Sequence, residues 1–298
     1  GEIFANFGEL KEKYGYNNLF IIAQDVSHAR GAANIINSIA TKKGWNVTGL
    51  EIYPTGATDF SMGLLKAKKT NTEIINIWMD MPESAILLKQ WYDMQIPALP
   101  FGSTLAAAEQ PGFWKATDGK GEYTLCNVVN AGNAPSNATP WTMKFYDAYT
   151  KRWNVEPEGL GTSSSYMAVH VLKAAIEKAG SLKPDDVVAA LEETDMMGVY
   201  GRLRFDPKSH QVIPSTDPKE GAVGSILQWQ DGKRIVVYPK SIATGEILLP
   251  PGFIHHHRYR IGQIQAAVAR AHGNAQAPLR GQGQPGRGPL ERLHQPVR

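Results

Sequence analysis

Cysteine, long apolar runs and nucleotide-binding motifs are what this sequence most clearly lacks. Its 298 residues include one cysteine, Cys126, which excludes an intrachain disulfide framework. No apolar run approaches the roughly 20 residues that a membrane-spanning helix needs. No G-x-G-x-x-G motif follows the first predicted strand and no G-x-x-x-x-G-K motif occurs, so no cradle for a nucleotide phosphate is evident. The sequence therefore argues against disulfide-rich, membrane-spanning and nucleotide-dependent classes of protein.

Catalytic signatures are missing as well. The G-x-S-x-G elbow of α/β-hydrolases is absent, and before residue 254 histidine occurs only at His28, His170 and His210. Cys126 lies in an apolar, strand-like run at residues 123–129, where a free thiol packs as a small buried hydrophobe. A nucleophilic thiol would need a histidine and an electropositive setting. We therefore predict a protein that is not an enzyme, with no catalytic residue, no cofactor and no metal site.

Positive charge is scarce in the main part of the chain, although the formal net charge is +3. Residues 254–298 contain seven arginines, one acidic residue and no lysine, which leaves residues 1–253 with a net charge of −3. A mildly acidic chain without a basic stripe is not expected to bind nucleic acid. The Arg-, Gly-, Pro- and Gln-rich residues 254–298 cannot bury a core, so we predict a disordered tail. Its abrupt change of composition is what out-of-frame translation of GC-rich DNA would give.

The first hundred residues read as alternating strands and helices. A short continuous apolar run predicts a strand buried on both faces at 19–23, and further strands are predicted at 47–53, 74–79 and 98–101. Helical spacing of apolar residues follows at 29–43, after Asp59 and from Pro82 onward. This alternation is typical of an α/β fold with a doubly wound parallel sheet. Ligands of such sheets bind beyond the carboxyl ends of the strands, which selects the loops at 24–28, 54–58, 80–81 and 103–105.

The second half of the chain changes character. Amphipathic patterns predict helices over 141–153, 166–179 and 183–191, and strands return at 203–205, 225–229 and 235–238. A helical block that leaves the sheet, and strands that return to it, indicate two lobes joined by repeated crossovers. We divide the chain into a β/α lobe (1–122, lobe two), the helical part of lobe one (123–197), the return to lobe two with the hinge (198–253), and the tail (254–298).

Segments spread over residues 1–253 carry a common pattern. They are the strand and helix around Ile21, Ile22 and Gly31, YPTGATDFS at 53–61, LKQ at 88–90, SYMAV at 165–169, AAIEKAG at 174–180, VVAALE at 187–192 and GVYGRLRFD at 198–206. Their order and spacing resemble the leucine/isoleucine/valine-binding family of type I periplasmic binding proteins. The resemblance implies the type I periplasmic-binding-protein fold, an α/β fold with two Rossmann-like lobes of parallel sheets flanked by helices. It also implies that residue 1 falls near the first crossover and that the first half of lobe one is missing.

The same resemblance implies a function. Members of this family are the extracytoplasmic solute-binding components of ABC transporters, and they deliver a small solute to permease subunits in the membrane. For this chain we expect an amino acid, a related amide or an aromatic acid as the solute. We also expect a monomer in the periplasm, or an extracellular lipoprotein in an organism with a single membrane, and a signal peptide in the full-length parent. The alternative is a ligand-sensing regulator or receptor domain of the same fold.

Three residues at strand ends of lobe two are candidate ligand contacts by resemblance. His28 follows the first strand, where the family places an aromatic residue over the ligand, although it could simply be an exposed loop residue. Asp80 and Met81 follow the third strand, at the place of another ligand-facing aromatic. The Asp80 carboxylate could pair with an ammonium group of the solute or could cap the helix that opens at Pro82.

The other candidates follow the fourth strand and open a later helix. Amino-acid-binding members of the family place an acidic residue after the fourth strand, where it pairs with the α-ammonium group. This chain has Ser103 and Thr104 there, and the next acid is Glu109. Either the acid after the third strand supplies the counter-ion, or the solute has no amine, as in an aliphatic amide, a urea-like solute or an aromatic acid. Ser164 and Tyr166 match family positions that present hydroxyl and aromatic groups, although Tyr166 could instead be the first core residue of its helix.

Overall fold

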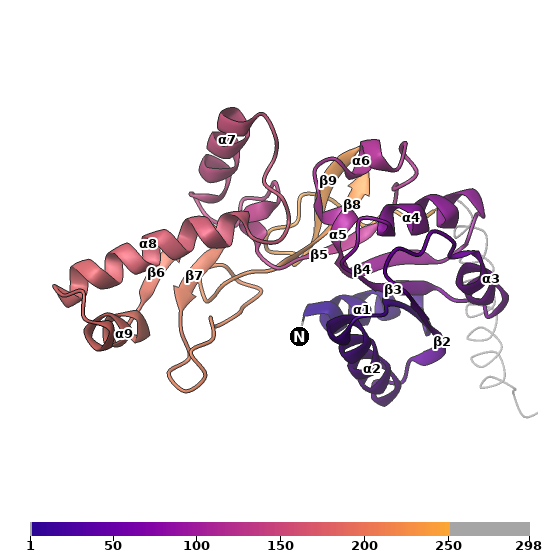
Figure 1. Ribbon diagram of the computed structural model, residues 1–298, viewed down its shortest axis with the longest axis horizontal. Coiled ribbons are helices and arrows are strands. Elements are labelled where there is room, and N and C mark those ends of the chain that lie inside the picture. Colours follow the sequence, from indigo (N-terminus) through magenta and orange to yellow (C-terminus); the bar gives the residue numbers. More distant parts are fainter. Residues whose placement is uncertain (1, 251–298) are drawn as a thin grey trace, which may run out of the picture. The chain divides into compact units, whose positions relative to one another are not determined.

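The computed structural model describes residues 2–250, and the predicted tail at 254–298 lies outside them. A seven-stranded sheet has the strand order β2-β1-β3-β4-β5-β8-β9 (Figure 1). Its strands are β1 (Asn18–Gln24), β2 (Asn46–Tyr53), β3 (Ile74–Met79), β4 (Leu99–Leu105), β5 (Leu125–Val128), β8 (Ser225–Gln230) and β9 (Lys233–Tyr238). The first five pair in parallel, and β8 and β9 add an antiparallel ribbon. The predicted α/β class with a mainly parallel sheet is confirmed.

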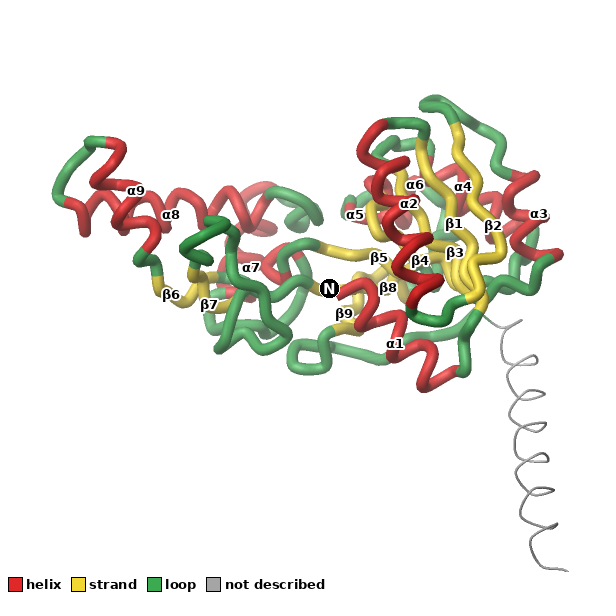
Figure 2. Tube along the Cα trace, turned by 90° about the horizontal axis from the view of Figure 1, so that it is seen from below, coloured by secondary structure: helices red, strands yellow, loops and turns green. Residues whose placement is uncertain are grey.

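The strands β1 and β3 are mostly apolar because helices cover both faces of the sheet, and Asn76 is a buried polar residue within β3. In β1, Phe20 and Ile22 belong to one core, whereas Leu19 and Ile21 belong to the other. The first core packs under α3 (Ser61–Lys69), α4 (Ser84–Asp93), α5 (Ala106–Glu109) and α6 (Phe113–Ala116), and the second under α1 (Glu2–Tyr14) and α2 (Ser27–Lys42) (Figure 1, Figure 2). Since side chains alternate between the faces of a strand, a strand between two helical layers has no face toward solvent, and apolar residues predominate on both faces.

The fourth strand is longer than the sequence suggested. We predict that it ends at Phe101, but β4 continues to Leu105, so Ser103 and Thr104 lie within the strand and not in a loop after it. The reason is pairing with β3: after an irregularity beside Ile77, the ladder resumes with Thr104 opposite the next residue of β3. The prediction of a loop at 103–105 is therefore wrong.

Two helices also begin later than predicted. α4 starts at Ser84 and not at Pro82. α3 starts at Ser61, with Phe60 as its N-cap residue. Asp59 lies one residue earlier, yet its Oδ1 accepts a hydrogen bond from the Ser61 N–H at 2.9 Å. Asp59 therefore satisfies a free backbone N–H of the first turn, as expected of a capping carboxylate.

The residues between β5 and β8 fold around a third core. Its elements are the 3₁₀ turn η1 (Ala131–Asn133), α7 (Thr142–Trp153), α8 (Thr162–Ala179), α9 (Pro184–Glu192) and a hairpin of β6 (Asp195–Gly198) and β7 (Gly201–Arg204). In this core Met167 of α8 packs with Leu203 of β7 and with Val199 of the hairpin turn. The sequence pattern does not predict β6. Several residues at 198–223 pack here with the helices, and the chain re-enters the large sheet at β8.

Arg234 of β9 ties the sheet to the third core. Its side chain is buried, and its Nη2 lies 2.7 Å from the Glu156 carboxylate. The guanidinium also donates to the hydroxyl of Tyr146 and to the carbonyl of Pro157, both at 2.9 Å. A buried cation requires such partners, so the link between α7 and α8, which contains Glu156 and Pro157, is held against β9.

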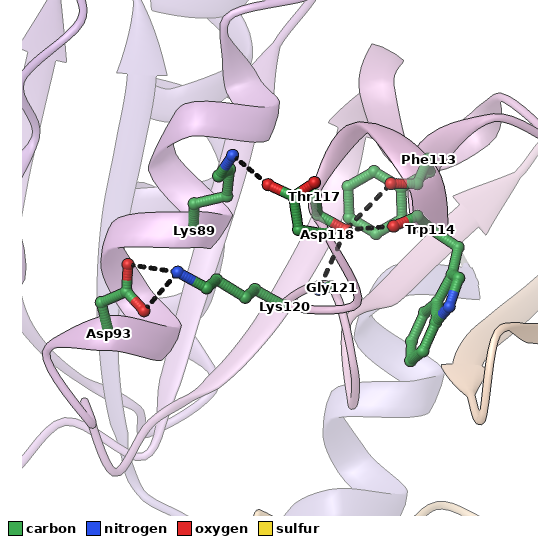
Figure 3. A network of polar contacts seen from close by, with 8 residues as sticks. All are labelled: Lys89, Asp93, Phe113, Trp114, Thr117, Asp118, Lys120 and Gly121. Atoms are coloured by element: carbon green, nitrogen blue, oxygen red, sulfur yellow. Dashed lines mark hydrogen bonds and ion pairs between the residues drawn. The ribbon is translucent and has the colours of Figure 1, made fainter.

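A second set of ion pairs holds the loop between α6 and β5 against α4 (Figure 3). Lys89 of α4 lies 2.6 Å from Asp118, and Lys120 lies 2.8 Å from Asp93 of α4. Within the loop, the buried Thr117 hydroxyl accepts a backbone N–H of the same turn at 3.1 Å. Two ion pairs therefore join this loop to α4, and a hydrogen bond within the loop stabilises its turn.

Candidate functional site

The carboxyl ends of β1 and β3 bring two of the predicted site residues together. His28 lies in the first turn of α2, and its Nδ1 is 3.5 Å from Oδ2 of Asp80, which follows β3. Their side chains are 61% and 48% exposed, so a solute can reach both. Because neighbouring parallel strands end at the same edge of a sheet, the two residues meet although they are far apart in the sequence. We call this edge, with His28 and Asp80, the carboxyl edge.

Gln24 fixes the backbone of the carboxyl edge. It is the last residue of β1 and is buried. Its Oε1 accepts the N–H of Asp80 at 2.9 Å, and its Nε2 donates to the hydroxyl of Thr55 at 2.8 Å. One amide thus joins the ends of β1 and β3 to the loop after β2. We did not select Gln24 from the sequence, although a polar residue directly after the apolar run 19–23 was a usable signal.

A chain of hydrogen bonds runs from the carboxyl edge into the sheet. The indole N–H of Trp78 donates to Oδ1 of Asn76 at 2.7 Å, and Nδ2 of Asn76 donates to the hydroxyl of Ser103 at 2.6 Å. The Trp78 ring also meets the His28 imidazole edge to face, with centroids 6.1 Å apart. The structure therefore gives the buried Ser103 a partner inside the protein, and the neighbouring Thr104 is half-buried.

The two predicted residues after β3 differ in their surroundings. Met81 is 4% exposed and belongs to the core under α3 and α4. Asp80 points to the surface beside His28 and does not cap the following helix, because the N-cap residue of α4 is Glu83, without a side-chain hydrogen bond. Of the two, Asp80 alone presents its side chain where a solute could bind it.

Glu109 is a second acid near Asp80. It ends α5 and is 4% exposed, and no cation of the described residues pairs with it. Burial raises the pKa of Glu109 to about 7; the backbone N–H of Leu105 opposes this shift, and the negative charge of Asp80 adds to it. A carboxyl group in this state exchanges its proton near neutral pH. The sequence predictions include Glu109 only as the next acid after Ser103 and Thr104. Its position shortly after a predicted strand could have indicated a site residue.

Ser164 and Tyr166 lie in α8, and no hydrogen bond or ring contact within residues 6–250 joins them to His28 or Asp80. The Ser164 hydroxyl accepts a hydrogen bond from Asn130. Tyr166 is 41% exposed and packs against Phe145 and His170, with ring centroids 4.8 and 4.6 Å away. It is therefore an exposed ring in an aromatic cluster and not the first buried residue of its helix.

Across the described part of the chain, no group of three or more His, Cys, Asp or Glu residues is arranged to hold a metal ion. None of the helices described there combines the length and the hydropathy needed to cross a membrane. Cys126 is buried, and burial raises its pKa well above the usual value, so the thiol stays protonated.

In open α/β sheets ligands bind beyond the carboxyl ends of the strands, which is where this chain presents the exposed side chains of His28 and Asp80. The chain belongs to the periplasmic binding protein family, whose model matches residues 3–219.

Several relatives are distant and longer than this chain. Leu/Ile/Val-binding protein homolog 8 of Brucella melitensis biotype 1 is 22% identical over 232 residues, which cover 76% of this chain and 56% of that protein. This chain thus spans little more than half of that relative's length. A putative branched-chain amino acid ABC transporter protein from Silicibacter pomeroyi has a similar structure, with a TM-score of 0.72 and 17% identity over 83% of this chain and 66% of the other. An ABC-transporter solute-binding protein from R. palustris in complex with benzoate has a TM-score of 0.63, with 11% identity over 77% and 60% of the chains.

Proposed function

We propose that this chain is the solute-binding component of an ABC transporter and that the carboxyl edge is its contribution to the solute site. The observation that carries the proposal is the pair His28 and Asp80, two exposed polar side chains that meet at the strand ends of a periplasmic binding protein. In this role the chain would act without catalysis, outside the cytoplasm, and would deliver its solute to permease subunits. The names of its relatives, which include Leu/Ile/Val-binding and ABC-transporter proteins, support this reading.

We further propose that the solute carries an amine. Asp80 is half-exposed and has only the weakly basic His28 within ion-pair distance among the described residues. Glu109 adds a second carboxyl group close enough for the charge of Asp80 to raise its pKa. An ammonium group bound to the exposed Asp80 carboxylate would neutralise charge that the protein itself leaves uncompensated, and the buried Glu109 would add to the attraction without touching the solute. A benzoate-like acid would bring a further negative charge to this edge and is therefore less well matched.

The other predicted site residues divide into those that could contact the solute and those that are buried. Thr104 can accept a hydrogen bond from the solute beside Asp80, and Ser164 and Tyr166 are proposed contacts from the third core. Met81 and Ser103 are each 4% exposed, so they would shape the site without touching the solute.

A ligand screen tests the proposed function. We expect the thermal midpoint of the purified protein to rise with at least one amino acid and not with aromatic acids or amides, because a ligand that binds only the folded state stabilises it by mass action. A solute that stabilises the wild type should stabilise the His28→Ala and Asp80→Asn variants less. A solute that stabilises the wild type and both variants equally would show that the carboxyl edge is not the site.

A further inference from the structure

A hollow that has no part in the proposed solute site opens at the other end of the strands, away from the carboxyl edge. It has a volume of about 450 Å³ and is lined by the last turn of α4 and the segments before β4 and β5, with Trp91, Tyr92, Ile96, Glu122, Tyr123 and Pro250 among its residues. Ile96 precedes β4 and Glu122 precedes β5, so the hollow lies at the amino ends of these strands. The seven residues of β4 place it roughly 20 Å from the carboxyl edge at about 3.3 Å per residue. We call it the amino-edge hollow.

The walls of the amino-edge hollow are aromatic and braced. Tyr92 is 45% exposed and Trp91 is buried beneath it. One ion pair of Figure 3 links the two walls, because Lys120, two residues before Glu122, is paired at 2.8 Å with Asp93, the residue after Tyr92.

Tyr123 occupies an unusual backbone conformation in this wall. Its φ is +67°, a left-handed value that costs free energy for a bulky residue and that is tolerated best by glycine, asparagine and aspartate. Its N–H donates to the carbonyl of Trp229 at 2.9 Å, and its carbonyl accepts from the side chain of Gln228 at 2.8 Å. These two bonds to β8 hold the backbone of the strained residue in place at the hollow.

The charge of Glu122, in the wall of the hollow, determines which ligands the hollow could bind. The Glu122 carboxylate accepts the N–H of Asp231 at 2.9 Å. Burial raises the pKa of Glu122, the Asp231 N–H opposes the shift and the negative charge of Asp231 adds to it. No lysine or arginine of the described residues forms an ion pair with Glu122. Aromatic faces around an unpaired carboxylate are the chemistry that recognises organic cations, through cation–π attraction and charge pairing.

We propose that the amino-edge hollow binds a small organic cation, such as a quaternary or primary amine, between Tyr92 and Tyr123 with its charge against Glu122. The cation would neutralise a carboxylate that has no cationic partner among the described residues. A neutral apolar molecule of the same shape would gain the aromatic contacts but leave the carboxylate uncompensated. The hollow thus distinguishes ligands by charge, and its occupation does not depend on the carboxyl edge.

The experiment compares two probes of nearly equal shape. Choline carries a quaternary ammonium group, and 3,3-dimethylbutan-1-ol is its neutral carbon analogue. Isothermal titration calorimetry on the full chain should show that choline binds about tenfold more tightly or better, as the loss of one charge-assisted contact of about 1.4 kcal/mol would give. Glu122→Gln should weaken choline binding by about the same factor, and Tyr92→Leu, at an exposed position with little bearing on folding, should weaken it severalfold. Glu12→Gln, an exposed carboxylate on α1, is the matched control and should change nothing.

Each contrary result overturns the proposal. Equal binding of the two probes would make the hollow a simple apolar cavity. Choline binding that is weakened by Asp80→Asn and not by Glu122→Gln would place the cation at the carboxyl edge. No detectable binding by the full chain at the highest soluble concentration of choline would mean that the hollow does not bind organic cations.

Discussion

Replacing Glu109 by glutamine tests the electrostatics of the carboxyl edge through stability. The carboxyl group is 4% exposed, and burial raises its pKa from 4.5 to about 7. Between these two values the folded protein holds a proton that the unfolded chain releases. The free energy of unfolding therefore falls as the pH rises through this interval, and the stabilisation by the protonated form is lost above the folded pKa. At about 1.36 kcal/mol per pKa unit, the whole loss is roughly 3 kcal/mol.

The Glu109→Gln variant removes this titration. We expect wild type and variant to have similar unfolding free energies at about pH 4.5, and we expect the variant to be more stable by up to roughly 3 kcal/mol at about pH 8. The hydrogen bond from the Leu105 N–H, which glutamine keeps only in part, reduces the gain. Urea unfolding followed by tryptophan fluorescence across this pH range measures the difference. Glu12→Gln, at an exposed position, is the control.

Two results would refute this reasoning. If the variant showed the same decline between about pH 4.5 and 8 as the wild type, Glu109 would titrate at an ordinary pKa. If the variant were less stable than the wild type at every pH, the carboxylate would have a favourable partner that outweighs its burial. Because all other titrating groups are shared, the difference between the two proteins isolates the contribution of Glu109.

Further predictions concern one binding residue and three structural ones. In a full-length protein, Asp80→Asn should weaken the binding of an amine-bearing solute by roughly 2–5 kcal/mol, measured by calorimetry. The binding of solutes without an amine should not change. Arg234→Met should lower the unfolding free energy by roughly 2–4 kcal/mol because carbonyl and hydroxyl groups lose a buried donor, whereas Glu156→Gln should cost about 1 kcal/mol or less because that carboxylate is half-exposed. Gly201→Ala should destabilise by about 2–4 kcal/mol in urea unfolding, since φ is +118° and a Cβ would lie 2.1 Å from a carbonyl oxygen. The control Gly31→Ala, in open space on α2, should stabilise by about 0.5–1 kcal/mol.

Local patterns located the central strands of the sheet well because these strands are buried. The apolar run at 19–23 lies inside β1, and the predicted strand at 74–79 coincides with β3. A strand between two helical layers carries apolar residues on both faces, and such a run has few alternative readings. The strand β6 was missed for the opposite reason: its four residues are mostly exposed and pair only with β7, so no burial pattern marks them.

The site was predictable only in outline. The rule that ligands bind at carboxyl strand ends selected His28 and Asp80, and the structure places them side by side. The rule does not say which face a side chain takes after a strand ends, so it could not separate the exposed Asp80 from the buried Met81. Nor could it find Gln24, whose role depends on contacts with two other strand ends. Such contacts depend on tertiary structure and leave little trace in local sequence.

The location of the solute is the central claim, and hydrogen exchange with and without a stabilising solute tests it most directly. Binding slows the exchange of backbone amides that it orders or shields. We predict protection at the ends of β1 and β3 and in the loop after β2, at residues 24–28, 53–58 and 80–84, together with residues 103–109. We predict none around Tyr92 and Glu122. Protection that leaves the residues around His28 and Asp80 unchanged and appears elsewhere would contradict the account.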